Sequence, residues 1–165
     1  MPRRQSVKLE SDNAVTARTA CTNCPSEEIM SGVNGTGNTM LNAVSLSPTI
    51  TANDLSESIR FYTEGLGFEV HERHESDGVL RFVMLRSGQA HLGLGQDDFA
   101  KGKDRIKGVG LRLWITTSKN LSSLANRARS AGLTLDHEPE ALPWGAMAFA
   151  VTDPDGIKIT ISEGG

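Results

Sequence analysis

Arg112 and Trp114 are two side chains that can hold a ligand, and they alternate with aliphatic residues. Leu111, Leu113 and Ile115 have the period-two pattern of a strand and are expected to face the core. Arg112 and Trp114 then share the opposite face. An indole ring stacks on aromatic molecules, and a guanidinium binds carboxylate or phosphate through two parallel hydrogen bonds. The pair predicts contact with an aromatic or anionic ligand; the alternative is an arginine stem packed over the indole at a dimer interface.

Three further candidates follow from their neighbours in sequence. His91 precedes Leu92, so it is expected on the polar face of a strand, where an imidazole can contact a ligand or transfer a proton. Lys158 and Thr160 alternate with isoleucines and are expected on the polar face of the last strand. A structural role for His91 and a solvated position for Lys158 are the alternatives.

Trp144 lies in a loop, between Pro143 and Gly145. An aromatic side chain in such a loop either covers a ligand or closes the end of the core, and the sequence leaves both open. Thr49 and Thr51 complete the polar candidates, because they alternate with Ile50 in a short predicted strand.

Two clusters of metal-binding residue types do not predict a metal site. His71 and His74 are three positions apart, and on a regular strand they point to opposite faces unless a bulge intervenes. Cys21 and Cys24 have metal or redox spacing, but no second pair or nearby histidine completes four ligands. The sequence also contains no phosphate-binding loop, no Ser-His-Asp order and no catalytic cysteine motif.

Charge and composition limit the possible partners. The chain has 165 residues, a formal net charge of −3 and a pI near 5.8, which gives no basic field for nucleic acid or anionic lipid. No apolar run approaches the roughly 20 residues that span a bilayer, and the N-terminus lacks the apolar core of a secretory signal. We therefore expect a cytoplasmic protein with no nucleic-acid or membrane partner.

The chain divides into an N-terminal extension, 1–46, and a folded domain, 47–165. The extension is rich in Ser, Thr, Asn and Gly and contains no Phe, Trp or Tyr. This composition predicts a disordered or flexible segment. Within the domain, a strand, a helix and three strands are predicted at 47–53, 55–64, 68–73, 79–85 and 90–94. The same order recurs at 109–115, 118–130, 133–137, 146–151 and 157–162. Two such units, 47–96 and 109–163, predict an α+β fold.

The second half of the chain carries the clearest family motif. This motif is a turn between two strands, Thr152-Asp153-Pro154-Asp155-Gly156. Three other motifs precede it, in chain order the helix from Asp54-Leu55 to Phe61-Tyr62, then Leu66-Gly67-Phe68, then Pro143-Trp144-Gly145. In this order the motifs resemble those of the vicinal oxygen chelate superfamily, which includes glyoxalase I, extradiol dioxygenases, fosfomycin-inactivating transferases and bleomycin-binding proteins. The resemblance implies two βαβββ units that form curved sheets around a cavity, the glyoxalase/bleomycin resistance/dihydroxybiphenyl dioxygenase-like fold. It also implies a homodimer in which the partner completes the cavity.

Catalytic members of this superfamily hold a divalent metal, and the resemblance gives the positions of the ligands. They fall at Ser47, at Gly93 (or at His91 in a shifted register), at Gly110 and at Thr160. Only His91 is a usual ligand, and about three are needed.

The resemblance with this departure predicts a protein that binds a small organic molecule without a family-type metal or other cofactor. The expected cavity residues are Thr49, Thr51, His91, Arg112, Trp114, Trp144, Lys158 and Thr160. The alternative is a metal-dependent lyase or dioxygenase of the same superfamily, so whether the protein is an enzyme stays open.

Overall fold

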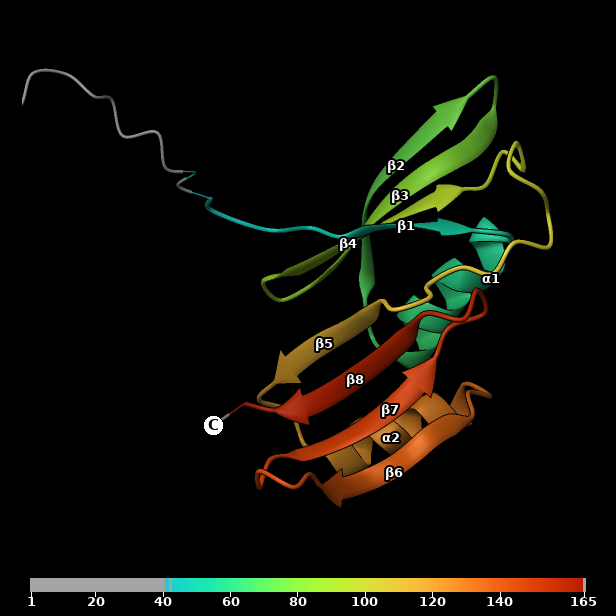
Figure 1. Ribbon diagram of the computed structural model, residues 1–165. Helices are drawn as coiled ribbons and strands as arrows, with labels where there is room; N and C mark the ends of the chain where they lie inside the picture. The colour runs from blue at the N-terminus through green and yellow to red at the C-terminus, as the bar shows by residue number, and fades with distance from the viewer. Residues whose placement is uncertain (1–40, 42, 165) are drawn as a thin grey trace, which may run out of the picture. The chain divides into compact units, whose positions relative to one another are not determined.

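The computed structural model describes Leu41 and residues 43–164, which form two four-stranded sheets with short helices (Figure 1). In chain order the elements are β1 (Thr49–Ala52), α1 (Leu55–Arg60), the π-helix η1 (Phe61–Gly65), β2 (Glu69–Ser76), β3 (Val79–Ser87), β4 (Ala90–Gln96), β5 (Arg112–Thr117), α2 (Leu121–Ser130), β6 (Leu135–Ala141), β7 (Met147–Thr152) and β8 (Lys158–Glu163). None of these helices is long and apolar enough to cross a membrane.

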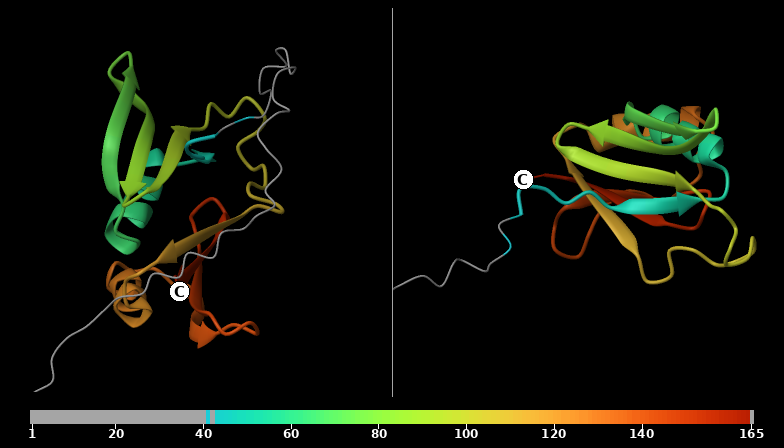
Figure 2. Two further views of the ribbon diagram at one scale, coloured as in Figure 1. Left: turned by 90° about the vertical axis from the view of Figure 1, so that its left-hand side faces the viewer. Right: turned by 90° about the horizontal axis from the view of Figure 1, so that it is seen from above.

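The two sheets have the same topology. The first has the order β1-β4-β3-β2 and the second the order β5-β8-β7-β6, and Figure 2 shows both from two further directions. In each sheet the first strand pairs in parallel with the last, and the other pairs are antiparallel. The predicted α+β fold of two strand-helix-strand-strand-strand units is confirmed.

The first helical segment begins and ends close to the predicted positions, but its second half is a π-helix. Asp54 is the N-cap, and its side chain accepts a hydrogen bond from the backbone N–H of Glu57 at 2.9 Å. The chain is helical to Gly65, close to the predicted end at Glu64, but from Phe61 onward it is the π-helix η1. The Thr63 hydroxyl donates to the carbonyl oxygen of Ile59 at 2.8 Å, and a bond of this kind often bends a helix.

The core is built from the alternating aliphatic residues of both sheets together with the helices. Its largest fully buried side chains include Tyr62, Phe149, Leu85 and Leu94. Because side chains alternate along a strand, burying one face of each sheet leaves the other face to the polar residues. The two polar faces are therefore set by the same alternation that builds the core.

Several predicted boundaries in the second unit are wrong. The strand predicted from Val109 begins at Arg112, because the Leu111 N–H donates to the Gly108 carbonyl oxygen at 2.9 Å in a turn where Gly110 has a φ of 77°. The helix predicted from Ser118 begins at Leu121 behind the N-cap Asn120. Most of the predicted N-terminal extension, including Cys21 and Cys24, lies outside the described residues.

Candidate functional site

The polar face of the second sheet carries an arginine and a tryptophan that are fixed by hydroxyl groups of β8. Arg112 Nη1 donates to Thr160 Oγ1 at 3.0 Å, and Trp114 Nε1 donates to Ser162 Oγ at 2.8 Å. Thr160 and Ser162 are only 4% and 3% exposed. Arg112 and Trp114 thus cover the two hydroxyl groups and present their own planar groups outward. A ligand on this face would meet Arg112 before it met Thr160.

A second indole lies beside the first. The Trp114 and Trp144 ring centroids are 6.0 Å apart with the planes inclined by 37°. Trp114 is 48% exposed and Trp144 is 67% exposed, although large aromatic side chains are usually well buried. Trp144 belongs to a turn that the Gly145 N–H closes on the Leu142 carbonyl oxygen at 2.8 Å. The two predicted candidates therefore form one exposed aromatic surface.

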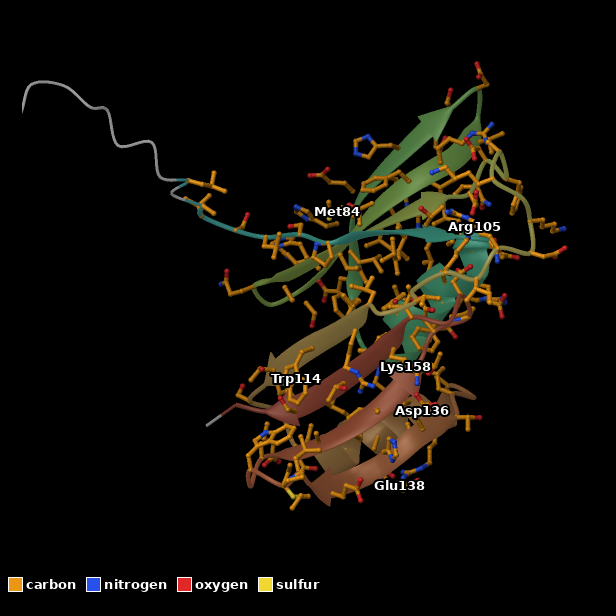
Figure 3. All side chains as sticks on the ribbon, in the orientation of Figure 1. Met84, Arg105, Trp114, Asp136, Glu138 and Lys158 are labelled. Carbon is orange, nitrogen blue, oxygen red and sulfur yellow. The ribbon has the colours of Figure 1, made fainter. Side chains whose placement is uncertain are left out.

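Lys158 lies next to Arg112 in the sheet. The two residues are direct partners in the parallel β5–β8 register, and both are exposed. Figure 3 shows Trp114 on β5 and Lys158 on β8, with Asp136 and Glu138 on β6. Asp136 accepts a hydrogen bond from Thr152 Oγ1 at 2.6 Å, and Glu138 pairs with Arg129, so each of these carboxylates has its own partner.

The polar face of the first sheet is occupied by an aromatic ring that the sequence analysis did not single out. Thr49 and Gly93 are direct partners across β1 and β4. A Cβ at Gly93 would lie 2.7 Å from Thr49 Oγ1 and 2.8 Å from Phe82 Cζ. The Phe82 ring therefore fills the space that a side chain at Gly93 would need. Thr51 is exposed further along β1, beside a polar pocket of about 390 Å³.

Three histidines gather near Glu72 on the first sheet. A register irregularity between Val70 and Glu72 breaks the regular alternation of β2. His71 Nε2 and His74 Nε2 lie 3.8 and 3.4 Å from the Glu72 carboxylate oxygens, and the His91 ring lies 6.1 Å from the His71 ring. The bulge that the sequence could not show brings His71 and His74 to one carboxylate.

These side chains do not form a metal site. Nowhere in the described part of the chain are three His, Cys, Asp or Glu side chains arranged to hold a metal ion. At the positions given by the resemblance, Ser47 precedes β1, Gly93 has no side chain, Gly110 lies in a turn, and Thr160 accepts from Arg112. This set of residues does not fit a divalent metal ion, and a cofactor-free site stays a prediction.

A buried lysine in the segment between the sheets links residues of both units. Lys107 Nζ lies 2.8 Å from Asp97 Oδ2, 3.3 Å from Asp155 Oδ1 and 2.7 Å from Asn53 Oδ1, and its side chain is only 6% exposed. Arg105, labelled in Figure 3, reaches the same Asp97 oxygen at 2.9 Å. Hydrogen bonds from Lys107 and then Arg105 hold the pKa of Asp97 well below its usual range. This cluster positions the connecting segment and has no free acid or base.

The turn motif after β7 is also tied to the first helix. Tyr62 is fully buried, and its hydroxyl donates to Asp153 Oδ2 at 2.9 Å. Asp153 Oδ1 accepts the backbone N–H groups of Asp155 and Ile157 at 3.0 and 2.7 Å. Burial raises the pKa of Asp153, and burial beside Asp153 raises the pKa of Tyr62. This pair joins the two motifs that carry the family resemblance and therefore has a structural role.

A pocket of about 1010 Å³ lies between α2 and the residues that follow η1. Its lining includes core residues such as Phe149 and Ile161. Its Arg127 already donates to the carbonyl oxygens of Thr63 and Glu64, at 3.0 and 2.8 Å. The pocket therefore offers an apolar surface but no paired acid and base.

The sequence analysis missed Phe82 and Ser162. The signal for both was present, because Phe82 alternates with Val83 and Ser162 with Ile161 in strands that were predicted. The contact between Trp114 and Trp144 had no local signal, since the two residues are thirty positions apart.

Comparison with known proteins places these sheets in one family. Residues 42–161 match the sequence model of the Glyoxalase/Bleomycin resistance protein/Dioxygenase superfamily. A search of curated protein sequences finds no match.

Solved structures of the same fold come from several bacteria. A superfamily member from Sphaerobacter thermophilus is 26% identical, with a TM-score of 0.60 over 76% of this chain and 100% of its own. TioX from Micromonospora is 16% identical, with a TM-score of 0.61 over 73% and 98% of the two chains. A lactoylglutathione lyase from Agrobacterium tumefaciens is 16% identical, with a TM-score of 0.55 over 74% and 96%. At these identities the last two show the fold alone.

Proposed function

Because the chain belongs to the Glyoxalase/Bleomycin resistance protein/Dioxygenase superfamily, we propose that it binds a small organic molecule on the polar faces of its sheets, without a family-type metal ion. The observation that carries the proposal is the exposed pair Trp114 and Trp144, with Trp114 held by Ser162. An aromatic surface that is held in position before a ligand arrives loses little entropy on binding.

The proposed cavity is shared between two copies of the chain. β1 and β5 are edge strands of their sheets, opposite the other edges β2 and β6, and each is paired on one side only among the described residues. Edge strands carry unpaired backbone groups that a second chain can cover. Exposed apolar residues beside β5, Val109 and Leu111, support burial of this edge by a partner. A homodimer would therefore bring a polar face of one copy to a polar face of the other.

The proposed cavity has two kinds of lining. The first sheet provides hydroxyl and imidazole groups, and the second provides indole and cationic groups. The proposed contacts are Thr49, Thr51 and His91 from the first sheet, and Arg112, Trp114, Trp144 and Lys158 from the second, with Thr160 behind Arg112. A cytoplasmic location belongs to the same proposal.

A thermal-shift screen of diverse small organic molecules tests the binding. Some compounds are expected to raise the Tm, because a ligand that binds only the folded state stabilises it. Trp114→Leu should abolish the shift for the same compounds, whereas Val79→Ala, an exposed position on β3, should not. A screen without any stabilising compound would contradict the proposal.

Two further measurements test the other parts. Sedimentation at micromolar concentration is expected to give twice the mass of the chain, and a monomer would contradict the shared cavity. Metal analysis after purification without chelator is expected to find no stoichiometric metal. Stoichiometric zinc, nickel, iron or manganese would overturn the metal-free site.

A further inference from the structure

Two cations on the polar face of the second sheet lack carboxylate partners. Arg112 and Lys158 are direct partners in the β5–β8 register, so their Cα atoms are about 5 Å apart. Neither forms an ion pair with any carboxylate among the described residues, although seven such pairs occur elsewhere in that part of the chain. Arg112 uses Nη1 on Thr160, and a guanidinium has five N–H donors. The remaining donors can receive an anionic group.

The aromatic pair lies at a defined distance from these cations. Arg112 and Trp114 are two residues apart on one strand, which corresponds to about 6–7 Å. Glu163 at the end of β8 has the opposite strand parity to Lys158 and Thr160, and the other strand carboxylates of this sheet are on β6, two strands from β8, about 10 Å. Asp136 on β6 already accepts from Thr152. On β5 and β8, the surface next to Trp114 is therefore positive.

We propose that the ligand is a planar aromatic anion, with its ring on Trp114 and Trp144 and its carboxylate or similar group on Arg112 and Lys158. The separation of the two subsites favours a bicyclic ring system over a single ring that bears the acid directly. This inference rests on the proposed function, because it names the ligand class of the same site. A guanidinium gives a planar anion two parallel hydrogen bonds, and an unpaired positive surface disfavours cationic ligands.

The protein contains only two tryptophans, and both belong to this site. Two indole N–H signals in a ¹H–¹⁵N spectrum therefore report on the site directly, and Trp144→Phe assigns them. Three probes separate the contributions. 2-Naphthoate has the ring and the charge, 2-naphthamide has the ring alone, and cyclohexanecarboxylate has the charge alone. Calorimetry on the full chain, in the oligomeric state found in solution, measures their affinities.

We expect 2-naphthoate to shift both indole signals and to bind at least about tenfold more tightly than 2-naphthamide, as a charged hydrogen bond requires. Arg112→Gln should remove this preference, while Arg81→Gln, which removes an exposed arginine of the first sheet, should leave it unchanged. Cyclohexanecarboxylate should bind at least about tenfold more weakly than 2-naphthoate.

The outcomes separate this inference from the proposed function. Equal binding of naphthoate and naphthamide, or an unchanged preference in Arg112→Gln, would overturn the anionic subsite. Equal binding of cyclohexanecarboxylate would overturn the aromatic one. If the acids leave the indole signals unmoved while another class of compound shifts them, the inference fails and the proposed function stands. If no compound of the wider screen binds, both fail.

Discussion

The hydrogen bond between Tyr62 and Asp153 gives the sharpest test of how the two units are held together. Tyr62 is fully buried, and its hydroxyl lies 2.9 Å from Asp153 Oδ2. Tyr62→Phe removes this donor and leaves the ring in place. Asp153 Oδ1 keeps its two backbone donors, so Oδ2 alone loses a partner. The substitution should therefore test one interaction and disturb the packing little.

The expected loss follows from the charge of the acceptor. Hydrogen bonds to charged groups contribute about 1.5–3 kcal/mol, and neutral ones about 0.5–1.5 kcal/mol. We expect Tyr62→Phe to lower the free energy of unfolding by about 2 kcal/mol at pH 7, where the acceptor carries more negative charge than at pH 4. For a domain of this size, about 4 °C per kcal/mol gives a fall in Tm of roughly 8 °C.

The pH dependence has a definite sign. Burial raises the pKa of Asp153 above the value of about 3.9 for an unfolded aspartate, and the Tyr62 hydrogen bond opposes that rise. A raised pKa in the folded state contributes stability that is present below pH 4 and lost as the pH rises through the folded-state pKa. Tyr62→Phe raises the folded-state pKa further. The difference between the variant and the parent should therefore be larger at pH 7 than at pH 4.

Urea unfolding followed by circular dichroism, at pH 7 and pH 4 and at one protein concentration, measures both differences. Asp153→Asn and the double variant complete a thermodynamic cycle, in which the pH-dependent part should disappear. A cost below about 0.5 kcal/mol at pH 7, or an equal cost at both pH values, would refute this account of the pair.

Three other substitutions test the polar face and the buried lysine. Gly93→Ala should lower the free energy of unfolding by about 1–3 kcal/mol in urea melts, because its Cβ meets the Phe82 ring at 2.8 Å. Gly95→Ala, whose Cβ is 3.8 Å from the same ring, is the control, and an equal loss in both would contradict the packing argument. Lys107→Met should lower the Tm at pH 7, and by less at pH 3, because Asp97 without the Lys107 hydrogen bond takes up a proton at a higher pH than in the parent. Asp97→Asn should make the loss of stability in acid less steep. The lowered pKa of Asp97 contributes stability above about pH 4 that is lost as the pH falls. If the free energy of unfolding of the variant falls with decreasing pH as steeply as that of the parent, this prediction is wrong.

The fold could be predicted because its signals are local. Ile157, Ile159 and Ile161 alternate with polar residues, and the preceding Asp-Pro-Asp-Gly turn fixes where the chain reverses. The resulting strand, β8, runs from Lys158 to Glu163, one residue from its predicted bounds. Alternation predicted that these isoleucines are buried. It did not predict that Thr160 and Ser162 are buried as well, beneath Arg112 and Trp114, or that Leu111, expected to face the core, is 43% exposed.

The details that could not be predicted depend on contacts between distant residues. Lys107 lies in a charged stretch that reads as a linker, yet it is buried because Asp155, forty-eight positions later, folds back onto it. The start of β5 at Arg112 depends on the turn at Gly110, and the bulge in β2 depends on its pairing with β3. Each of these needs the tertiary structure, in which packing overrides local propensity.

The Arg112–Thr160 hydrogen bond explains how this chain can keep its fold while its polar face favours another kind of binding. Thr160 stands where the family resemblance places a metal-binding glutamate, and its hydroxyl accepts from Arg112 at 3.0 Å. The isoleucines on either side of Thr160 are buried, so this strand serves the core whatever its polar face carries. The positive charge on that face comes from the Arg112 guanidinium and from Lys158. A guanidinium selects planar anions through its fork of N–H donors. The same strand therefore accounts for both family membership and the proposed preference for an aromatic acid.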